Sequence, residues 1–472
     1  MRNFLLSLGL VILCSSISGQ TPTIGWTELI TLDASEFGYT NLRMELDAAG
    51  NPIILHGKSG SNGGLYCTRW NGNGFDAPVQ VTAETGLFIN DSEGPQMAVS
   101  GNKVAVGYQI SGQWATGGRV VLSEDGGQTW SEPIPVSPGA TEDHFMPVPA
   151  FDADDNPWVA LKWGNAPALE GVLNWDEATG GFAPAVDAGA PFPGDAVCEC
   201  CASMPFLLDG RQYNMVRNNN SNIRDFHLAR TDAYGNWTES LDVDETDWLI
   251  NSCPASEAEV AILGDGQIAA VFMSAEGDGA RTHWSTIDPE AWSLTGTDRI
   301  DPALDFTENN PSIDADGDFA VAAWERNDGG YNIITAVGSN DASGMAQWPF
   351  QSTNATDGLS GHSRRPVIRT ADGVVHLVYQ RSAGNEIHYR RGTVGTSGLD
   401  ARPTADWTCV PTENGWRIDG LMGACQWRVL DWSGRTMASG RSQNGTIETG
   451  RWNAGLLEIQ TETSRKTFKV IR

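Results

Sequence analysis

Basic residues are scarce in this 472-residue sequence: 30 Lys and Arg stand against 59 Asp and Glu, for a formal net charge of −29. A chain this acidic repels nucleic acid and anionic membrane surfaces, so neither is expected as a partner. No apolar run beyond the N-terminus is long enough to cross a bilayer, so no transmembrane segment is predicted. P-loop, HExxH, GxSxG and dinucleotide-binding motifs are also missing, which argues against the enzymes that depend on them.

The first residues form a short apolar segment behind a positive charge. Arg2 precedes the apolar stretch Phe4 to Leu13, and small residues follow from Ser15 to Gly19. This pattern predicts a signal peptide, residues 1–19, that is removed on export. Since disulfides persist outside the cytoplasm, the cysteines are expected to pair by default.

Helical periodicity is missing as well, and a repeated strand–turn–strand pattern takes its place. Short apolar strands surround Asp, Gly or Asn turns, as in PAFDADDNPWVALKW from Pro149 and PVIRTADGVVHLVYQR from Pro366. Successive units lie about 55 residues apart, a spacing typical of four-stranded propeller blades. The sequence therefore predicts an all-β propeller over residues 20–392, with seven blades favoured and six as the alternative.

The last unit lacks a fourth strand, and the N-terminal segment WTELITLD (Trp26 to Asp33) resembles one without a unit of its own. We expect this segment to complete the last blade and to close the ring, which removes free sheet edges.

One turn matches a known propeller motif in every specified position. SEDGGQTW follows the Asp-box pattern S-x-D-x-G-x-T-W through Ser123, Asp125, Gly127, Thr129 and Trp130. It resembles the box of sialidase-like (BNR/Asp-box) propellers, in which the Asp side chain bonds the backbone of the turn. The box supports the fold far more than it supports sialidase activity, because unrelated propellers share it.

The C-terminal part differs in composition. Residues 393–406 are predicted to be a linker. Residues 407–472 end in NAGLLEI (Asn453 to Ile459) and KVIR, and they resemble the type IX secretion sorting domain of Bacteroidetes. The resemblance implies a small Ig-like β-sandwich, the type IX machinery as a partner, export across the outer membrane, and a secreted or surface location. Cys409 and Cys425 are a candidate disulfide within it.

Propeller geometry assigns the polar loops to one face. Loops between blades share a face with loops between second and third strands, and convergent polar groups at a propeller mouth form the default binding site. The candidate site residues on that face, or at strand ends beside it, are Asp91, Asp143, His144, Arg217, Arg224, Asp225, Glu325, Arg326, Arg364, Arg365, Tyr379 and Arg381. For any single one, pairing between neighbouring blades is the alternative.

Three segments resemble a family of sialidase-like exported bacterial proteins: CECC (Cys198 to Cys201), VRNNNSNIRDF (Val216 to Phe226) and DWLINSCP (Asp247 to Pro254). On the same face, Cys253 is expected to bridge to one of Cys198, Cys200 and Cys201, with a second bond inside the cluster. In a strand, Cys201 would point away from the other two. A copper or zinc site on these thiols and free thiols are the alternatives; otherwise no metal or cofactor is expected.

Function is expected to reside on this face. A retaining sialidase needs three arginines on the substrate carboxylate and a tyrosine nucleophile activated by a glutamate. Arginines are present, but Tyr379 has no evident partner and the Arg-Ile-Pro motif is absent near Arg43. The leading interpretation is an exported sialidase-like propeller that binds an extracellular glycan or protein. A glycoside hydrolase of the exo-sialidase type, or a polysaccharide lyase, is the alternative.

Overall fold

The computed structural model divides into two compact units, residues 1–397 and 398–472. It describes residues 22–396 except 28, 35–38, 59–62, 165–166, 190, 195, 276–278, 302–305, 346–351, 360 and 383–384, plus the strand backbone between residues 408 and 471. The predicted signal peptide and most of the predicted linker lie outside these residues. Among the residues described, no helix has the length and apolar character needed to cross a membrane.

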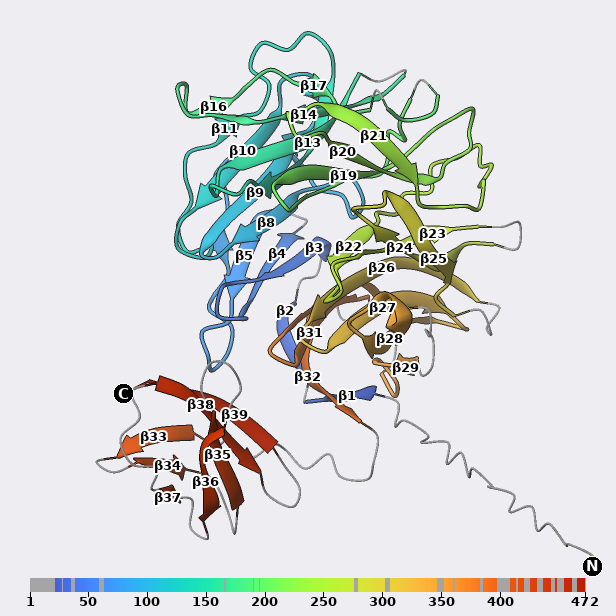
Figure 1. The fold of residues 1–472 in the computed structure, drawn as a ribbon. Helices are drawn as coiled ribbons and strands as arrows, with labels where there is room; N and C mark the ends of the chain where they lie inside the picture. Colours follow the sequence, from blue (N-terminus) through green and yellow to red (C-terminus); the bar gives the residue numbers. More distant parts are fainter. Residues whose placement is uncertain are drawn as a thin grey trace, which may run out of the picture. The chain divides into compact units, whose positions relative to one another are not determined.

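The first unit is a propeller of seven antiparallel blades, as the repeat predicts (Figure 1). Blade 1 contains β3 (Tyr39–Leu46), β4 (Pro52–Lys58), β5 (Gly64–Arg69) and β6 (Val79–Gln80). Blade 2 contains β8 (Gln96–Ser100), β9 (Lys103–Ile110), β10 (Gly118–Ser123) and β11 (Ile134–Pro135), with β7 (Leu87–Phe88) also on β9. Blade 3 contains β12 (His144–Phe151), β13 (Pro157–Trp163), β14 (Leu169–Leu173) and β17 (Val186–Asp187), with the hairpin β15 (Trp175–Asp176) and β16 (Gly181–Phe182) inserted.

The other four blades follow the same plan. Blade 4 contains β18 (Met204–Leu208), β19 (Arg211–Arg217), β20 (Phe226–Thr231) and β21 (Trp237–Asp242). Blade 5 contains β22 (Glu259–Ile262), β23 (Ile268–Ser274), β24 (Arg281–Asp288) and β25 (Ser293–Arg299). Blade 6 contains β26 (Thr307–Asp316), β27 (Phe319–Asn327), β28 (Tyr331–Ser339), β29 (Thr353–Asn354) and the short helix α1 (Ala342–Met345). Blade 7 contains β30 (Ser363–Ala371), β31 (Val374–Arg381) and β32 (Glu386–Thr396).

The N-terminus closes the ring on blade 7, as expected. Two strands pair with β32: β1 (Pro22–Trp26) at its C-terminal end and β2 (Ile30–Ala34) near its start. Since Pro22 pairs with Thr396, β32 runs four residues into the segment predicted as linker. The closure joins the two ends of the repeat and pairs the edge of β32 that would otherwise be free.

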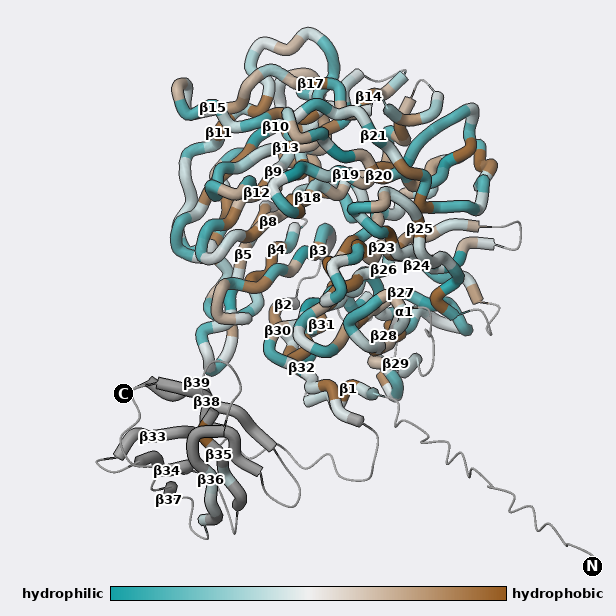
Figure 2. Tube along the Cα trace, viewed as in Figure 1, coloured by the Kyte–Doolittle hydropathy of each residue, from teal (hydrophilic) through white to brown (hydrophobic). Residues whose placement is uncertain are grey.

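Apolar side chains pack between neighbouring blades. Seven apolar clusters of described residues each join two adjacent blades around the ring. Trp158 is fully buried between blades 3 and 4, and Trp324 between blades 5 and 6. Hydrophobic residues concentrate along the strands and hydrophilic residues in the connecting loops (Figure 2). Burial of both faces of each blade is the main favourable contribution to stability and makes the ring a rigid frame for its loops.

The Asp-box turn joins β10 to β11 and has the structure that its residues predict. Asp125 accepts hydrogen bonds from the backbone N–H groups of Gln128 and Thr129 and from the Thr129 hydroxyl. Gly127 has φ 85°, and a Cβ there would lie 2.7 Å from the Cys67 sulfur, so a larger residue is excluded. The box is a structural turn on the face opposite to the candidate site.

The second unit consists of two antiparallel sheets. One contains β33 (Thr408–Thr412), β34 (Gly415–Asp419) and β37 (Thr446–Ile447), and the other β36 (Thr436–Ser442), β35 (Cys425–Leu430), β38 (Ala454–Gln460) and β39 (Arg465–Ile471). This strand content agrees with a small Ig-like β-module. The side chains of Cys409 and Cys425 lie outside the described residues.

Candidate functional site

The first strands of all seven blades surround a central cavity of about 480 Å³. Its lining carries acids and arginines from blades far apart in the sequence. They are Arg43, Glu45, Asp91, Asp152, Glu257, Glu259, Arg365 and Arg369. Whether these charges are available to a ligand depends on what they already contact.

Arg43 and Glu257 pair across the cavity. Arg43 Nη2 lies 2.8 Å from Glu257 Oε1, and Gln96 bridges the two by accepting from Arg43 Nε and donating to Glu257. Burial raises the pKa of Glu257, while Arg43 and the Gln96 hydrogen bond act in the opposite direction. The three side chains satisfy one another without a ligand.

The other two cavity arginines are also paired. Arg369 Nη2 lies 2.6 Å from Glu45 and 2.6 Å from Glu259. Arg365 donates to Asn310 Oδ1 at 2.8 Å, and its Nε lies 3.8 Å from Asp91. The cavity arginines therefore tie blades 1, 2, 5, 6 and 7 together.

The sialidase arrangement is not assembled in the described residues. All three cavity arginines already have carboxylate partners, and no tyrosine is among the described residues that line the cavity. Tyr379 is fully buried in the apolar cluster between blades 6 and 7, and its hydroxyl has no hydrogen-bond partner. Burial raises its pKa to about 12, the opposite of what an activated nucleophile requires.

Three further candidates form a structural group in blade 4. Arg217 is fully buried, donates to the backbone oxygens of Arg224 and Met273, and stacks on Phe226 at 4.0 Å. Asp225 accepts the Trp248 backbone N–H, and burial together with nearby acids raises its pKa to about 7. Arg217 and Asp225 thus order the loops beside them.

The candidates of blades 6 and 7 also pair between or within blades. Glu325, with 1% exposure, accepts from Asn310 Nδ2, from the Arg365 backbone and from Arg364 Nε. The remaining two contact neighbours as well: Arg326 lies 3.7 Å from Asp301, and Arg381 donates to Ser363 at 3.3 Å. The alternative of pairing between blades describes Glu325, Arg364 and Arg365.

A second cavity of about 190 Å³ lies on the predicted face and has a different lining. We call it the aromatic pocket. It is lined by Phe88, Glu93, Gln109, Trp114, Asp143, Phe145, Met146 and Glu199. Phe88 and Gln109 lie in blade 2, Phe145 and Met146 lie in β12 of blade 3, and the others lie in the loops that lead into β8, β12 and β18 and in the loop between β9 and β10. All of these loops belong to the face that propeller geometry selects.

Three aromatic rings lie in series along this pocket. Trp114 makes edge-to-face contacts with Phe88, at 5.2 Å between centroids, and with Phe145, at 6.5 Å. Trp114 has 37% of its surface exposed, so its ring is not buried inside a blade. An exposed ring held by two others is a rigid apolar platform.

The polar groups of the aromatic pocket are acidic. Glu93, Asp143 and Glu199 line it, and no Lys or Arg is among the described lining residues. Burial raises the pKa of Glu93, and the nearby Cys198 and Glu199 raise it further. Gln109 is buried, and its Oε1 is inaccessible and has no hydrogen-bond partner among the described residues.

Of the candidate residues, only Asp143 lines this pocket. His144 instead bonds Ser137 Oγ through Nδ1 at 2.6 Å, packs edge-on against Trp163, and has its pKa lowered by burial. Sequence reasoning, which searched for charged residues, missed Phe88, Trp114 and Phe145. Phe88 lies three residues before the candidate Asp91, and Phe145 directly follows the candidate His144, so both rings adjoin residues that the sequence already indicated.

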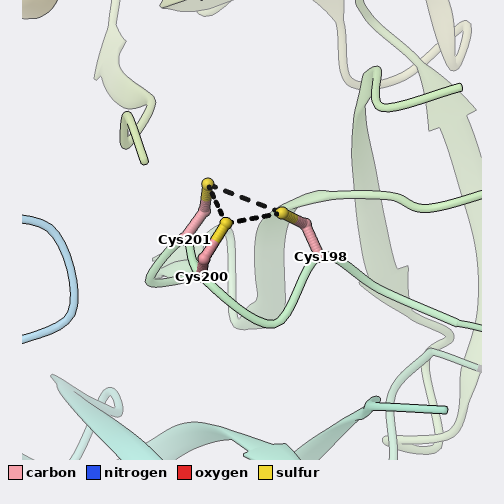
Figure 3. A group of neighbouring side chains, drawn as sticks. All are labelled: Cys198, Cys200 and Cys201. Atoms are coloured by element: carbon pink, nitrogen blue, oxygen red, sulfur yellow. Dashed lines mark hydrogen bonds between the residues drawn. The ribbon is translucent and has the colours of Figure 1, made fainter. Parts of the chain in front are cut away.

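The cysteine segment borders the aromatic pocket through Glu199. Residues 199–201 form a turn rather than a strand, so the sulfurs of Cys198, Cys200 and Cys201 converge (Figure 3). A disulfide joins Cys200 to Cys253 with 6.1 Å between Cα atoms, which staples the loop before blade 4 to the loop before blade 5. Cys198 and Cys201 are free thiols, so the second bond expected inside the cluster is not formed.

Comparisons with protein-family models and with curated proteins found no match. Among solved structures, a fungal alcohol oxidase of the AA5 family in complex with copper is similar at 9% identity and TM-score 0.50, covering 95% of this chain and 100% of that chain. A protein of unknown function from Dyadobacter fermentans has 13% identity and TM-score 0.45, with 79% and 99% covered. An α-L-arabinanase from Penicillium chrysogenum has 11% identity and TM-score 0.44, with 78% and 98% covered. The chain is a seven-bladed β-propeller, and these likenesses concern that fold alone.

Proposed function

We propose that this propeller binds an uncharged extracellular glycan in the aromatic pocket. The observation that carries the proposal is the exposed Trp114 ring, held by Phe88 and Phe145 beside three carboxylates. A sugar ring presents an apolar C–H face and a rim of hydroxyls. An aromatic platform suits the first, and carboxylate acceptors suit the second. No cofactor is needed for this role.

The charge of the pocket argues for an uncharged ligand. Sialic acid and uronic acids carry a carboxylate, which Glu93, Asp143 and Glu199 would repel. No described lining residue is basic, and Arg224, which lies 3.7 Å from Glu199 but does not line the pocket, already has that carboxylate as a partner. The volume of about 190 Å³ is below the usual range for a drug-sized ligand and suits a single terminal ring.

The test is a binding screen with purified protein on immobilised neutral oligosaccharides, sialosides and uronate-containing polysaccharides. We expect binding confined to neutral glycans and weakened by Trp114→Ala. Trp175→Ala is the matched control, because Trp175 packs on Phe182 in the hairpin between the third and fourth strands of blade 3. Binding that is selective for sialosides, or equally reduced by both variants, would contradict the proposal.

A hydrolase is the second candidate, and Glu93 favours it. Most glycosidases pair a protonated carboxylic acid with an ionised carboxylate, and a raised pKa supplies the first. Glu93 has its pKa raised, and Asp143 and Glu199 line the same pocket. Incubation of the bound glycan with wild-type protein and Glu93→Gln separates the two functions. Reducing ends released by the wild type alone, with binding kept in both, would establish catalysis.

We also propose export, which rests on the two terminal segments. Residues 1–19 would direct the chain across the inner membrane, and residues 407–472 would engage the type IX machinery at the outer membrane. Expression in a host that has this machinery tests the proposal. The full chain should reach the surface or the medium, and a chain ending at residue 406 should stay in the periplasm.

A further inference from the structure

Four cysteines meet at one point beside the aromatic pocket, and only two of them are bonded to each other. The Cys198 sulfur lies 3.2 Å from that of Cys200 and 3.8 Å from that of Cys201 (Figure 3). The Cys200–Cys253 disulfide occupies the other side of the group. Cys198 and Cys201 therefore form a C-x-x-C pair of free thiols, already close and held against a structural disulfide.

Two buried arginines favour the thiolate form of Cys198. Arg224 Nη1 donates to the Cys198 sulfur at 3.0 Å, and both Arg224 and Arg217 act on this thiol with positive charge. The contact with Cys201, together with the charges of Arg217 and Arg224, lowers the pKa of Cys198 to about 6 against the effect of burial. The same contact and burial raise the pKa of Cys201. A thiolate beside a protonated thiol is the arrangement of reactive C-x-x-C pairs.

The third free cysteine shows what a structural thiol looks like in the same chain. Cys67 is buried between blades 1 and 2, and burial raises its pKa to about 12. No described arginine donates to its sulfur. The contrast with Cys198 shows that burial alone does not lower the pKa of a thiol, so the contacts with Cys201 and the arginines account for the lowered pKa of Cys198.

The electrostatics also distinguish this pair from a thiolate metal site. A soft metal ion such as copper(I) or zinc would fit a group of thiolates. Here one of the sulfurs, that of Cys200, is already bonded to Cys253. Arg224 and Arg217 place two positive charges beside Cys198, and these would repel a metal cation. These features favour a dithiol over a metal ligand set.

We propose that Cys198 and Cys201 are a redox-active dithiol that exchanges with small extracellular disulfides. The Cys198 thiolate attacks one sulfur of a disulfide RSSR, which forms a Cys198–SR mixed disulfide and releases RS⁻. Cys201 then loses its proton and attacks the Cys198 sulfur, which forms a Cys198–Cys201 bond and releases the second RS⁻. The two cysteines are oxidised by two electrons, and RSSR is reduced to two thiols.

Glu199 lies in the turn between the two cysteines and also lines the aromatic pocket. Cys198 and Cys201 are buried, but the turn between them belongs to no strand, and the Glu199 side chain is 44% exposed. A movement of this turn can expose the pair without disturbing a blade. Because Glu199 also lines the aromatic pocket, closing the second disulfide would reposition one wall of that pocket. The proposal does not depend on what the pocket binds.

The experiment is a redox titration of the full chain in glutathione buffers, equilibrated for hours, quenched with an alkylating reagent and mapped peptide by peptide. We expect Cys198 and Cys201 to become protected together as oxidised glutathione increases, and to be recovered on reduction. Cys200–Cys253 should stay oxidised throughout, and Cys67 should stay reduced. In Cys201→Ala the reaction should stop at a Cys198–glutathione mixed disulfide, which adds one glutathione to the mass.

Three results would overturn the proposal. Cys198 and Cys201 could stay unmodified over the whole range, which would make them structural thiols. Stoichiometric copper or zinc that depends on both residues would make them a metal site. Loss of the Cys200–Cys253 bond in preference would identify that disulfide as the reactive one. Arg224→Lys is the control for misfolding, because it changes a residue beside Cys198 but keeps the positive charge. The variant should still exchange, at a rate within about tenfold of the wild type.

Discussion

The central cavity and the aromatic pocket belong to the same propeller, but they differ in how far their charged side chains are paired with one another. In the central cavity Arg43, Arg365 and Arg369 are paired with carboxylates from other blades. In the aromatic pocket no lysine or arginine is among the described lining residues, although Arg224 lies 3.7 Å from Glu199, and an exposed Trp114 lies next to the carboxylates. The larger cavity is therefore occupied by its own interactions, and the smaller one presents groups to a ligand.

This difference shows that volume and charge density are poor guides to a propeller's binding site. Polar side chains that satisfy one another have already lost their hydration, and a ligand would have to break those contacts to bind. Ligand sites more often combine apolar area with a few polar groups that remain available. That criterion supports the proposal that the aromatic pocket binds the ligand, while the ion pairs of the central cavity join the blades.

The largest effect should come from breaking the central network. Arg369→Ala leaves Glu45 and Glu259 without the guanidinium that both contact at 2.6 Å. Removing one partner of a buried ion pair costs about 3–5 kcal/mol. The free energy of unfolding, measured with urea, should fall by that amount. Glycan binding by the folded fraction should not change.

A surface ion pair supplies the control for this variant. Arg69 lies 3.3 Å from Asp76, and both side chains are about one-third or more exposed. Arg69→Ala should reduce the free energy of unfolding by less than about 1 kcal/mol. If Arg369→Ala were equally mild, or if it abolished glycan binding, the central cavity would be a ligand site after all.

The next largest effect should be on binding. Trp114→Ala removes the platform of the aromatic pocket, and a tryptophan at the centre of an interface contributes about 2 kcal/mol or more. The dissociation constant, measured by calorimetry, should rise about 30-fold. The melting temperature should change little, since the ring is already 37% exposed. Unchanged affinity with a lowered melting temperature would make Trp114 a packing residue.

The fold could be predicted from the sequence because its signals are local. Each blade repeats strand–turn–strand patterns within about 55 residues, and SEDGGQTW specifies its own turn through Asp125. Closure by the N-terminal segment followed from one missing strand and one surplus strand. The end of β32 was misplaced because glycine and threonine in residues 392–396 indicate a linker, whereas pairing with β1 keeps them in a strand.

The site was harder to predict because its contacts are distant in the sequence. Glu45 and Arg369 are 324 residues apart, and no local pattern shows that they pair. Propeller geometry predicts a functional face, and the aromatic pocket lies on it, but the position of each side chain there depends on how the blades pack against one another. The cysteine segment shows the same limit. As a strand it would separate Cys201 from Cys198, and as a turn it brings them within 3.8 Å.

The smallest predicted effect concerns Glu93, whose pKa is raised by burial and by its negative neighbours. A carboxyl with a raised folded-state pKa contributes stability below its unfolded pKa of about 4.3, and loses that contribution as the pH rises through the folded value. Glu93→Gln removes this loss. The variant should therefore melt higher than the wild type at pH 7, and the difference should vanish near pH 4. The gain should stay below about 1 kcal/mol, because the group is only half buried and solvent screens it.

Glu199→Gln sharpens the same measurement. It keeps Glu93 but removes one of the two negative charges that raise its pKa, so the loss of stability on raising the pH should remain with a smaller amplitude. Melting curves of wild type, Glu93→Gln and Glu199→Gln from pH 4 to pH 8 give the comparison. If the wild type and Glu93→Gln changed in parallel over that range, Glu93 would be an ordinary surface carboxylate. The acidity of the aromatic pocket would then carry no destabilising charge, as in the paired central cavity.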